Sequence, residues 1–369
     1  MKRLLLLAAL TASLTAQAQN ILVGTYTEGT HSEGIYLYSY NPETTEVELK
    51  SVAKSGNPSF VIANDKGTMA YSVNEFNDGR QGVSAYTIKD QLIQKVDSLI
   101  IPKDMVDGED PCNLLLLDNV LITTNYTGGS VTAFRLSETG RFGGLAQYFS
   151  FAMEHINNFN GQTIAVDVAH MHCALLSPDG KYMFVTNLGN DCIHRFELGD
   201  DDNPLKRSEI VWKNNSLFKV GPRHMIFSTD GRYAYLLGEL GDKLIVFAYH
   251  DGQLTPVQSL AAYTGRGHGS ADIHLSPDGR YLYTSHRLKK DGIAIFNVNQ
   301  INGQVTPAGY QPTGKHPRNF AISPDGRYLL VACRDDNRIE IYSIDKETGL
   351  LTLTDKTINV PAPVCVQFL

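Results

Sequence analysis

The chain has 369 residues, of which 42% are hydrophobic and 19% charged, the composition of an ordinary soluble globular protein. Its 32 lysines and arginines against 39 aspartates and glutamates give a net charge of −7 without a basic stripe, so no nucleic-acid partner is expected. The five cysteines show neither metal-binding nor redox spacing, and we expect buried small hydrophobes with at most one or two bridges.

The first 18 residues have the three parts of a secretory signal peptide: Lys2-Arg3, an apolar run from Leu4 to Leu14, and Ala16-Gln17-Ala18. The apolar run is too short to span a bilayer, and no later segment is long and apolar enough to do so. We therefore expect a periplasmic or secreted protein with no membrane span. Residues 19–369 are predicted to form a single domain.

The segments that follow read as β-strands. Ile21–Tyr26, Gly34–Tyr40 and Val47–Lys54 resemble the second, third and fourth strands of a four-stranded unit that lacks its first strand. Further strands are expected at Met69–Val73 and Val120–Thr124, each after a polar turn. Between residues 142 and 168 we expect an extended loop on one face. Helical periodicity is not convincing anywhere after residue 18.

A repeated phrase dominates the second half of the chain. It reads SPDGKYMFVT at 177–186, STDGRYAYLL at 228–237, SPDGRYLYTS at 276–285 and SPDGRYLLVA at 323–332. The glycines of these turns lie 51, 48 and 47 residues apart. A period in this range with β-type units indicates a propeller in which each repeat is one blade. In the unit that carries the first copy, strands are predicted at 172–177, 181–186, 192–197 and 208–212.

The C-terminal segment Val364–Leu369 is a lone strand with no partner in its own unit. Pairing it with the incomplete N-terminal unit closes the ring and removes two sheet edges that would otherwise promote aggregation. With that composite blade the count is seven. The sequence thus predicts an all-β protein, a single seven-bladed β-propeller with four antiparallel strands per blade.

This architecture selects candidate site residues by position. The first strand of each blade lines the central channel and the second runs antiparallel beside it, so the start of the first and the end of the second reach the same face. Ionisable groups that converge there indicate a functional site, unless they merely cap blade ends and satisfy one another. The polar residues at these positions are Ser59, Asn74, Glu75, Cys112, Asn113, Asn125, Tyr126, His170, His172, Asn187, Arg223, His224, Glu239, Asp272, His274, His286, Arg287, Arg318, Asn319, Arg334 and Asp335.

Four of these residues are the candidate catalytic groups. Arg223 and Arg287 offer planar forks that grip a carboxylate or phosphate, or else they form a salt bridge with Glu239. His172 is a candidate general base or acid, because imidazole titrates near neutral pH, unless it bonds to a neighbouring carbonyl. Glu239 orients a water or a histidine, or it pairs with an arginine. The candidate substrate-binding residues are Arg318, His224, His274, Asn187, Asn125 and Glu75.

Other chemistries lack a motif. His170 and His172 point to the same side of a strand, yet no Asp/Glu cluster accompanies them in a ligand spacing. The chain has no phosphate-cradling glycine loop, no Gly-x-Ser-x-Gly elbow and no Cys–His signature. We therefore expect neither a metal nor a cofactor, and no covalent intermediate.

Several motifs match a known family along nearly the whole chain after residue 18. They are GTYTEG at 24–29, GIYLY at 34–38, NPSF at 57–60, VNE at 73–75, NYTGGSV at 125–131, HMHCALLSPDGKYMFVTNLGND at 170–191, GPRHMIFSTDGRYAYLLGEL at 221–240, SADIHLSPDGRYLYTSHR at 270–287 and PRNFAISPDGRYLLVA at 317–332. With them the chain resembles the seven-bladed lactonases, a family that includes bacterial 6-phosphogluconolactonases of propeller type and fungal carboxy-cis,cis-muconate cyclases.

The resemblance implies an active site made of a histidine, two arginines and a glutamate, which fall on His172, Arg223, Glu239 and Arg287. All four are among the residues that position in the ring selects. The chain also departs from the family: Asn187, His286 and Asp272 stand where aspartate, asparagine and glutamate are common. Because these positions border the same rim, the substrate can differ from that of better-known members.

The expected function is hydrolysis of a sugar-acid lactone by water that His172 activates, with arginines holding a small anionic substrate. One alternative is a cycloisomerase that uses the same groups to move a proton at carbon. Another is a non-catalytic propeller that binds a glycan or peptide at the channel mouth. We expect a monomer.

Overall fold

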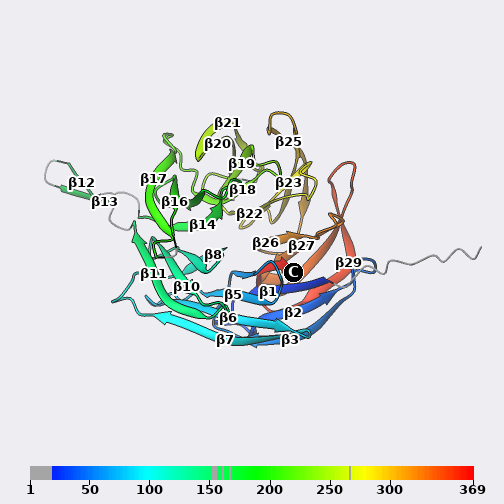
Figure 1. The fold of residues 1–369 in the computed structure, drawn as a ribbon. Coiled ribbons are helices and arrows are strands. Elements are labelled where there is room, and N and C mark those ends of the chain that lie inside the picture. The colour runs from blue at the N-terminus through cyan, green and yellow to red at the C-terminus, as the bar shows by residue number, and fades with distance from the viewer. Residues whose placement is uncertain (1–18, 152–155, 160–161, 166–167, 201, 266) are drawn as a thin grey trace, which may run out of the picture.

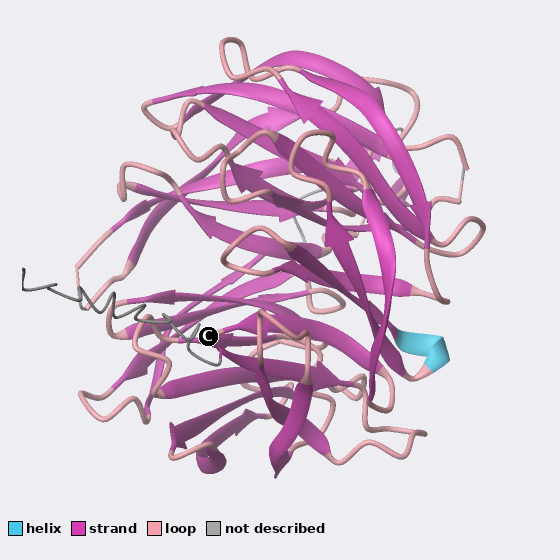
Figure 2. Cartoon of the chain, turned by 90° about the vertical axis from the view of Figure 1, so that its right-hand side faces the viewer, coloured by secondary structure: helices cyan, strands magenta, loops and turns pink. Residues whose placement is uncertain are grey.

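The protein is a ring of seven four-stranded antiparallel sheets (Figure 1), as the repeats predict. This computed structural model describes residues 19–151, 156–159, 162–165, 168–200, 202–265 and 267–369. The proposed signal peptide, residues 1–18, lies outside the described residues. Strands make up almost all regular structure (Figure 2), and in the described part of the chain the one helical element is a 3-10 turn, η1 (Arg334–Asp336).

Each blade has its first strand at the channel and its fourth at the rim of the ring. Blade 1 contains β30 (Pro363–Phe368), β1 (Gln19–Thr25), β2 (Gly34–Tyr40) and β3 (Val47–Lys54); blade 2 contains β4 (Val61–Ala63), β5 (Met69–Asn74), β6 (Gln81–Lys89) and β7 (Leu92–Ile101). Blade 3 contains β8 (Pro111–Leu117), β9 (Val120–Asn125), β10 (Ser130–Leu136) and β11 (Phe142–Ser150); blade 4 contains β14 (Met171–Leu176), β15 (Tyr182–Asn187), β16 (Cys192–Leu198) and β17 (Leu205–Lys213).

The remaining three blades follow the same plan. Blade 5 contains β18 (Pro222–Phe227), β19 (Tyr233–Gly238), β20 (Lys243–His250) and β21 (Gln253–Ala261); blade 6 contains β22 (Ser270–Leu275), β23 (Tyr281–His286), β24 (Gly292–Val298) and β25 (Val305–Pro312). Blade 7 contains β26 (Pro317–Ile322), β27 (Tyr328–Cys333), β28 (Arg338–Ile344) and β29 (Leu351–Asn359). The strands predicted for blade 4 agree with these bounds to within three residues.

The repeated Ser-x-Asp-Gly phrase forms the turn between the first and second strands. In blade 4, Ser177 Oγ donates to Asp179 Oδ1 over 2.6 Å and accepts from the Tyr182 N–H over 2.9 Å. Gly180 has φ +69°, a left-handed conformation that a residue with a Cβ rarely adopts. The side chains of serine and aspartate thus fold the turn locally, and glycine supplies the backbone angle.

The two ends of the chain close the ring, as predicted. β30 pairs antiparallel with β1, with Ile21 opposite Phe368 and Val23 opposite Val366. The described apolar core divides into seven clusters, each between two adjacent blades; the cluster between blades 1 and 7 joins Ile21 to Leu330 and Ile339. All five cysteines lie in the described part of the chain and are buried, and none of them forms a disulfide.

Short polar side chains fix the loops on the face where first strands begin. Asp191 accepts hydrogen bonds from the Val220 and Gly221 N–H groups, and Asp242 accepts from the His268 N–H and the Ser270 hydroxyl. In each case a loop after one blade's second strand binds the backbone that enters the next blade. The loops that carry the candidate site are therefore tied to the ring.

The prediction of an extended loop over residues 142–168 is wrong for residues 142–150, the first third of that range. Residues 142–150 form β11, because Phe142 packs edge-on against Tyr71 and Phe134 with ring centroids 6.4 and 6.2 Å apart. Beyond it, β12 (Ile156–Phe159) and β13 (Gln162–Ala165) pair as a hairpin that projects from the ring (Figure 1). Residues 152–155, 160–161 and 166–167 lie outside the described part. None of the described helices is long and apolar enough to cross a membrane.

Candidate active site

A cavity of about 630 Å³ opens at the mouth of the channel where the first strands begin. It is lined by residues from six blades, all at first-strand starts or in the loops beside them. They are Tyr26, Glu28, Asn57, Glu75, Asn77, Asp110, Cys112, Tyr126, Thr127, His172, Glu239 and Arg318. The positions selected from the sequence supply six of these residues, Glu75, Cys112, Tyr126, His172, Glu239 and Arg318, whereas the predicted catalytic residues Arg223 and Arg287 are not among the lining residues.

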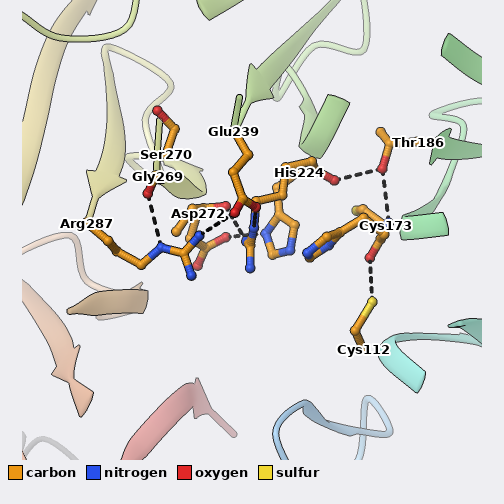
Figure 3. A network of polar contacts seen from close by, with 12 residues as sticks. Cys112, Cys173, Thr186, His224, Glu239, Gly269, Ser270, Asp272 and Arg287 are labelled. Atoms are coloured by element: carbon orange, nitrogen blue, oxygen red, sulfur yellow. Dashed lines mark hydrogen bonds and ion pairs between the residues drawn. The ribbon is translucent and has the colours of Figure 1, made fainter. Parts of the chain in front are cut away.

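Glu239 lies between two buried arginines at one wall of this cavity (Figure 3). Its Oε2 accepts from Arg223 Nε over 2.7 Å, and its Oε1 accepts from Arg287 Nη2 over 3.0 Å. Arg223 also donates to the Ala271 carbonyl, and Arg287 Nε donates to the Gly269 carbonyl over 3.0 Å. The salt-bridge alternative considered for both arginines is thus realised, within blade 5 for Arg223 and between blades 5 and 6 for Arg287.

The arginine–glutamate cluster carries a net positive charge. Burial acts to raise the pKa of Glu239, but Arg223, Arg287 and Arg318 outweigh it and hold that pKa below its ordinary value. The carboxylate is therefore ionised at neutral pH, and one negative charge faces two neighbouring guanidiniums. Charge-assisted hydrogen bonds of this kind keep the groups in fixed positions.

Arg318 differs from the other two arginines. It is half-buried at the start of β26, and its guanidinium makes no hydrogen bond or ion pair with any residue that the structure describes. Its guanidinium carbon lies 5.6 Å from the centre of the Tyr26 ring, whose hydroxyl donates to Glu75 over 2.9 Å. Arg318 thus lines the cavity over an aromatic face, and no described residue occupies its donors, which suits it to bind an anion.

His172 lines the cavity and is 4% exposed. Its ring contacts the rings of His224 and Tyr126 at centroid distances of 5.1 and 5.8 Å. Its Nδ1 is buried and makes no hydrogen bond with any described residue. Burial, and then the neighbouring Arg223, His224 and Arg318, hold the pKa of His172 well below its ordinary value. The imidazole is therefore neutral at neutral pH and able to accept a proton.

The six candidate substrate-binding residues fall into two groups. Glu75 and Arg318 line the cavity. The others hold the scaffold: Asn125 Nδ2 donates to the Ser130 and Thr132 hydroxyls, and Asn187 Oδ1 accepts from the His170 and Asn190 N–H groups. His224 and His274 both bind the carboxylate of Asp272, and His274 lines a separate cavity.

Several lining residues were not selected from the sequence. Tyr26, Glu28 and Asn57 belong to the composite blade and its junction with blade 2, and Asn77, Asp110 and Thr127 lie in loops one to three residues from the selected positions. Tyr26 directly follows the second strand of blade 1, so the positional rule extended to that blade would have selected it. Among the described residues no group of three or more His, Cys, Asp or Glu side chains is arranged to hold a metal ion.

The family model described as lactonase, 7-bladed beta-propeller, matches residues 20–368. The chain belongs to the seven-bladed β-propeller lactonases. This lactonase is 35% identical to a 6-phosphogluconolactonase of Formosa agariphila over 90% of its own length and 94% of the relative's. It is 33% identical to a 6-phosphogluconolactonase of Bacillus subtilis, over 94% and 97% of the two chains.

Solved structures agree with the relatives. A structure from Bacteroides fragilis, provisionally assigned as a 6-phosphogluconolactonase, is 40% identical to this lactonase, with a TM-score of 0.85 over 97% of this chain and 99% of that one. The periplasmic gluconolactonase of Pseudomonas aeruginosa is 27% identical, with a TM-score of 0.83 over 96% and 99%. The resemblance, the fold and the class of enzyme predicted from the sequence are thus confirmed.

Buried histidines should make the stability of this lactonase depend on pH. Burial, and then Arg223, lower the pKa of His224 to about 4, and burial, and then Arg287, lower the pKa of His286 to about 3. The unfolded chain takes up protons at these positions below about pH 6.5, whereas the folded chain does not. His274 acts oppositely: burial lowers its pKa, but Asp272 outweighs burial and raises it.

We therefore expect the free energy of unfolding to fall as the pH is lowered from about 6.5 to about 4. Thermal midpoints across this range would measure the trend. The His286→Gln variant, which lacks one depressed histidine, should show a shallower dependence than the parent protein. An equal or steeper dependence in that variant would contradict this assignment.

Proposed function

We propose that the chain hydrolyses the ring ester of a sugar-acid lactone, as a 6-phosphogluconolactonase-like enzyme in which His172 activates water. One observation carries the proposal: His172, a neutral buried imidazole, and Arg318, a guanidinium that pairs with none of the described residues, line the same cavity. The first is the group a hydrolytic reaction needs as a base, and the second suits an anionic substituent of the substrate.

In the proposed reaction His172 takes a proton from water as the hydroxyl oxygen bonds to the lactone carbonyl carbon. The tetrahedral intermediate then breaks the bond between that carbon and the ring oxygen, and the ring oxygen takes the proton back from the imidazolium. The product is the open-chain hydroxy acid. Glu239 faces the cavity and is assigned to orient the water.

The three arginines receive different roles. The sequence predicted that Arg223 and Arg287 hold the anionic group of the substrate, but their ion pairs with Glu239 occupy part of both guanidiniums. We assign that group to Arg318, and we assign to Arg223 and Arg287 the positive field that stabilises the oxyanion. Each donor aimed at such a developing charge contributes about 3 kcal/mol.

Two relatives named 6-phosphogluconolactonase and a structural neighbour named a periplasmic gluconolactonase support a sugar-acid lactone as substrate. The signal-like segment Lys2–Ala18, together with that neighbour, supports a periplasmic or secreted location. N-terminal sequencing of the exported protein should find a start near Gln19, and a cytoplasmic protein that retains Met1 would contradict the location.

The function is tested by supplying the purified protein with phosphorylated and unphosphorylated aldonolactones in water enriched in oxygen-18. Hydrolysis should place one solvent oxygen in the carboxylate of the product. Turnover without incorporation would indicate a cycloisomerase. Saturable binding with no turnover of any lactone would indicate a binding propeller, and either outcome would refute the proposal.

Replacing Arg318 tests the anion contact. In the Arg318→Gln variant we expect KM for an anionic lactone to rise about tenfold or more, since a hydrogen bond to a charged group is lost. The kcat should change much less, and an uncharged lactone should lose less affinity than an anionic one. Arg207→Gln, which removes an exposed arginine of β17, is the matched control. An unchanged KM in Arg318→Gln would remove Arg318 from the site.

A further inference from the structure

A chain of polar side chains crosses the central channel from the active-site cavity toward its other mouth. It starts at His172, whose ring lies 5.1 Å from that of His224. His224 Nδ1 lies 2.7 Å from Asp272 Oδ1 (Figure 3), and the other oxygen of Asp272 lies 2.9 Å from His274 Nε2. The three histidines and the aspartate come from the first strands of blades 4, 5 and 6.

The far end of this chain lies in a second cavity of about 340 Å³. His274 lines that cavity beside Ile322 and Phe368, which are at the ends of first strands, whereas the active-site cavity has their beginnings. The His274 side chain is 39% exposed, against 4% for that of Asp272. The network therefore joins the active site to the opposite mouth of the channel.

Asp272 is held as a permanent anion. Besides the two histidines, its carboxylate accepts from Asn319 Nδ2 over 2.5 Å, from the Ile273 N–H over 2.9 Å and from the Phe320 N–H over 3.4 Å. Burial acts to raise its pKa, but His274 and His224 outweigh burial and hold that pKa well below its ordinary value. An ionised carboxylate only accepts hydrogen bonds, so His224 carries its hydrogen on Nδ1 and keeps Nε2 as an acceptor.

The Nε2 of His224 can serve as a hydrogen-bond acceptor for His172 once His172 is protonated. When His172 takes a proton from water, both of its ring nitrogens carry hydrogen. Its buried Nδ1 has no hydrogen-bond partner among the described residues, and a buried N–H without an acceptor is costly. His224 packs edge-on against it with an interplanar angle of 68°, and its Nε2, which has no hydrogen-bond partner in the described part of the chain, can accept.

We propose that Asp272 is a positioning residue of the hydrolytic reaction: through His224 it presents an acceptor to protonated His172, and through His274 it couples that base to the opposite mouth. The inference rests on the proposed function of His172. Asp272 would act on His224 as the aspartate of a Ser-His-Asp triad acts on its histidine, by fixing the tautomer of the ring without taking up the proton itself.

Other charged groups surround the network and set the field in which it acts. Arg223 on β18 acts on both His172 and His224, and Arg318 on β26 acts on His172, so both arginines oppose protonation of His172; Glu239 after β19 is paired with Arg223. Cys173 on β14 and Cys365 on β30 adjoin Asp272, but burial raises their thiol pKa values to about 11 and about 12. Both thiols are therefore neutral, so the anion that favours a proton within the network is Asp272.

The test compares Asp272→Asn, His274→Gln and the exposed-surface control His250→Gln with the parent enzyme. The first readout is kcat/KM against pH for a lactone that the parent hydrolyses. The second is the tautomer and titration of the histidine rings, followed by nitrogen-15 NMR, which needs no turnover.

In Asp272→Asn we expect kcat/KM to fall at least about tenfold and His224 to lose its Nδ1–H tautomer. In His274→Gln we expect turnover to persist while the acid limb of the profile moves up by about half a pH unit, because a cation beside Asp272 is removed and protonated His172 is favoured. His250→Gln should match the parent in both readouts.

Unchanged profiles and unchanged histidine signals in both network variants would overturn the proposal. If Asp272→Asn does not fold, His274→Gln decides alone, since that side chain opens to the far cavity and its loss leaves the carboxylate with its other donors. If the parent hydrolyses no lactone, the proposed function fails. The NMR titration of His172 in His274→Gln then still shows whether the two mouths are coupled.

Discussion

Replacing His172 by alanine is expected to lower kcat/KM for lactone hydrolysis at least about a hundredfold, the loss typical of removing a general base. The physical reason is that His172 is the neutral imidazole of the cavity, kept so by burial and by Arg223. The four carboxylates that line the cavity are all engaged. Glu239 binds two arginines and Glu75 accepts from the hydroxyls of Tyr26 and Ser59, while Glu28 accepts from Asn57 and Asp110 accepts from Asn77 and Thr127.

The fold should survive this substitution, because His172 makes no side-chain hydrogen bond with described residues at its buried Nδ1 and lies at a cavity wall. Circular dichroism and the thermal midpoint would show this. His172→Gln keeps the size of the side chain without a basic nitrogen and should be as inactive as the alanine variant. His268→Gln, at an exposed loop of the same face, should keep full activity. Turnover near the parent level in both His172 variants would refute the base assignment.

The fold was predictable from local sequence because the blades repeat the same pattern of turn residues and alternating apolar residues. The Ser-x-Asp-Gly turn fixes one hairpin of its blade, as Ser177 and Gly180 do, and alternating apolar residues face the neighbouring blades. The composite blade was predictable because the N-terminal unit that begins at Ile21–Tyr26 has no first strand of its own, while the C-terminal strand Val364–Leu369 has no partner strand in its own unit. The β11 strand was missed because its irregular alternation of glycine and aromatic residues hides the strand period.

The site was predictable only as a set of positions. Sequence position brings His172, Glu239 and Arg318 to one mouth, because antiparallel strands deliver the start of one and the end of the next to the same face. Sequence position does not predict which of the arginines forms an ion pair with a carboxylate. That depends on how far each side chain extends across the ring. Arg287 extends from blade 6 to Glu239 of blade 5, whereas Arg318 packs over the ring of Tyr26 and pairs with no carboxylate of the described residues.

The proposed role of Asp272 could not be predicted from the sequence for the same reason, because it depends on contacts between residues far apart in the chain. In the sequence it stands two residues from His274 and 48 from His224, with nothing to join all three. Only the closed ring brings β18 and β22 side by side, so that the Asp272 carboxylate contacts both His224 and His274. The departure from the glutamate common in the family thus falls on the residue that links the two mouths of the channel.

The largest expected effect on stability is that of Glu239→Ala. The substitution leaves Arg223 and Arg287, whose side chains are 2% and 5% exposed, without their shared counter-ion and close to one another. Removing one partner of a buried ion pair leaves an uncompensated charge, at a cost of about 3–5 kcal/mol. We expect a loss near the lower end of that range, about 3 kcal/mol, because the Glu239 side chain itself is 22% exposed and water can reach its place.

Repulsion between the two arginines can be tested by removing one of them as well. In the double variant Glu239→Ala with Arg287→Met, one buried cation leaves together with the carboxylate, so stability should recover part of what Glu239→Ala alone loses. Glu239→Gln, which keeps the shape and one acceptor oxygen, should lie between the parent and Glu239→Ala in urea unfolding. All three variants should lose activity, since the positive field and the oriented water depend on the intact cluster. If Glu239→Ala unfolds at the parent's urea midpoint, or if the double variant is less stable than the single one, the carboxylate does not hold the two arginines together.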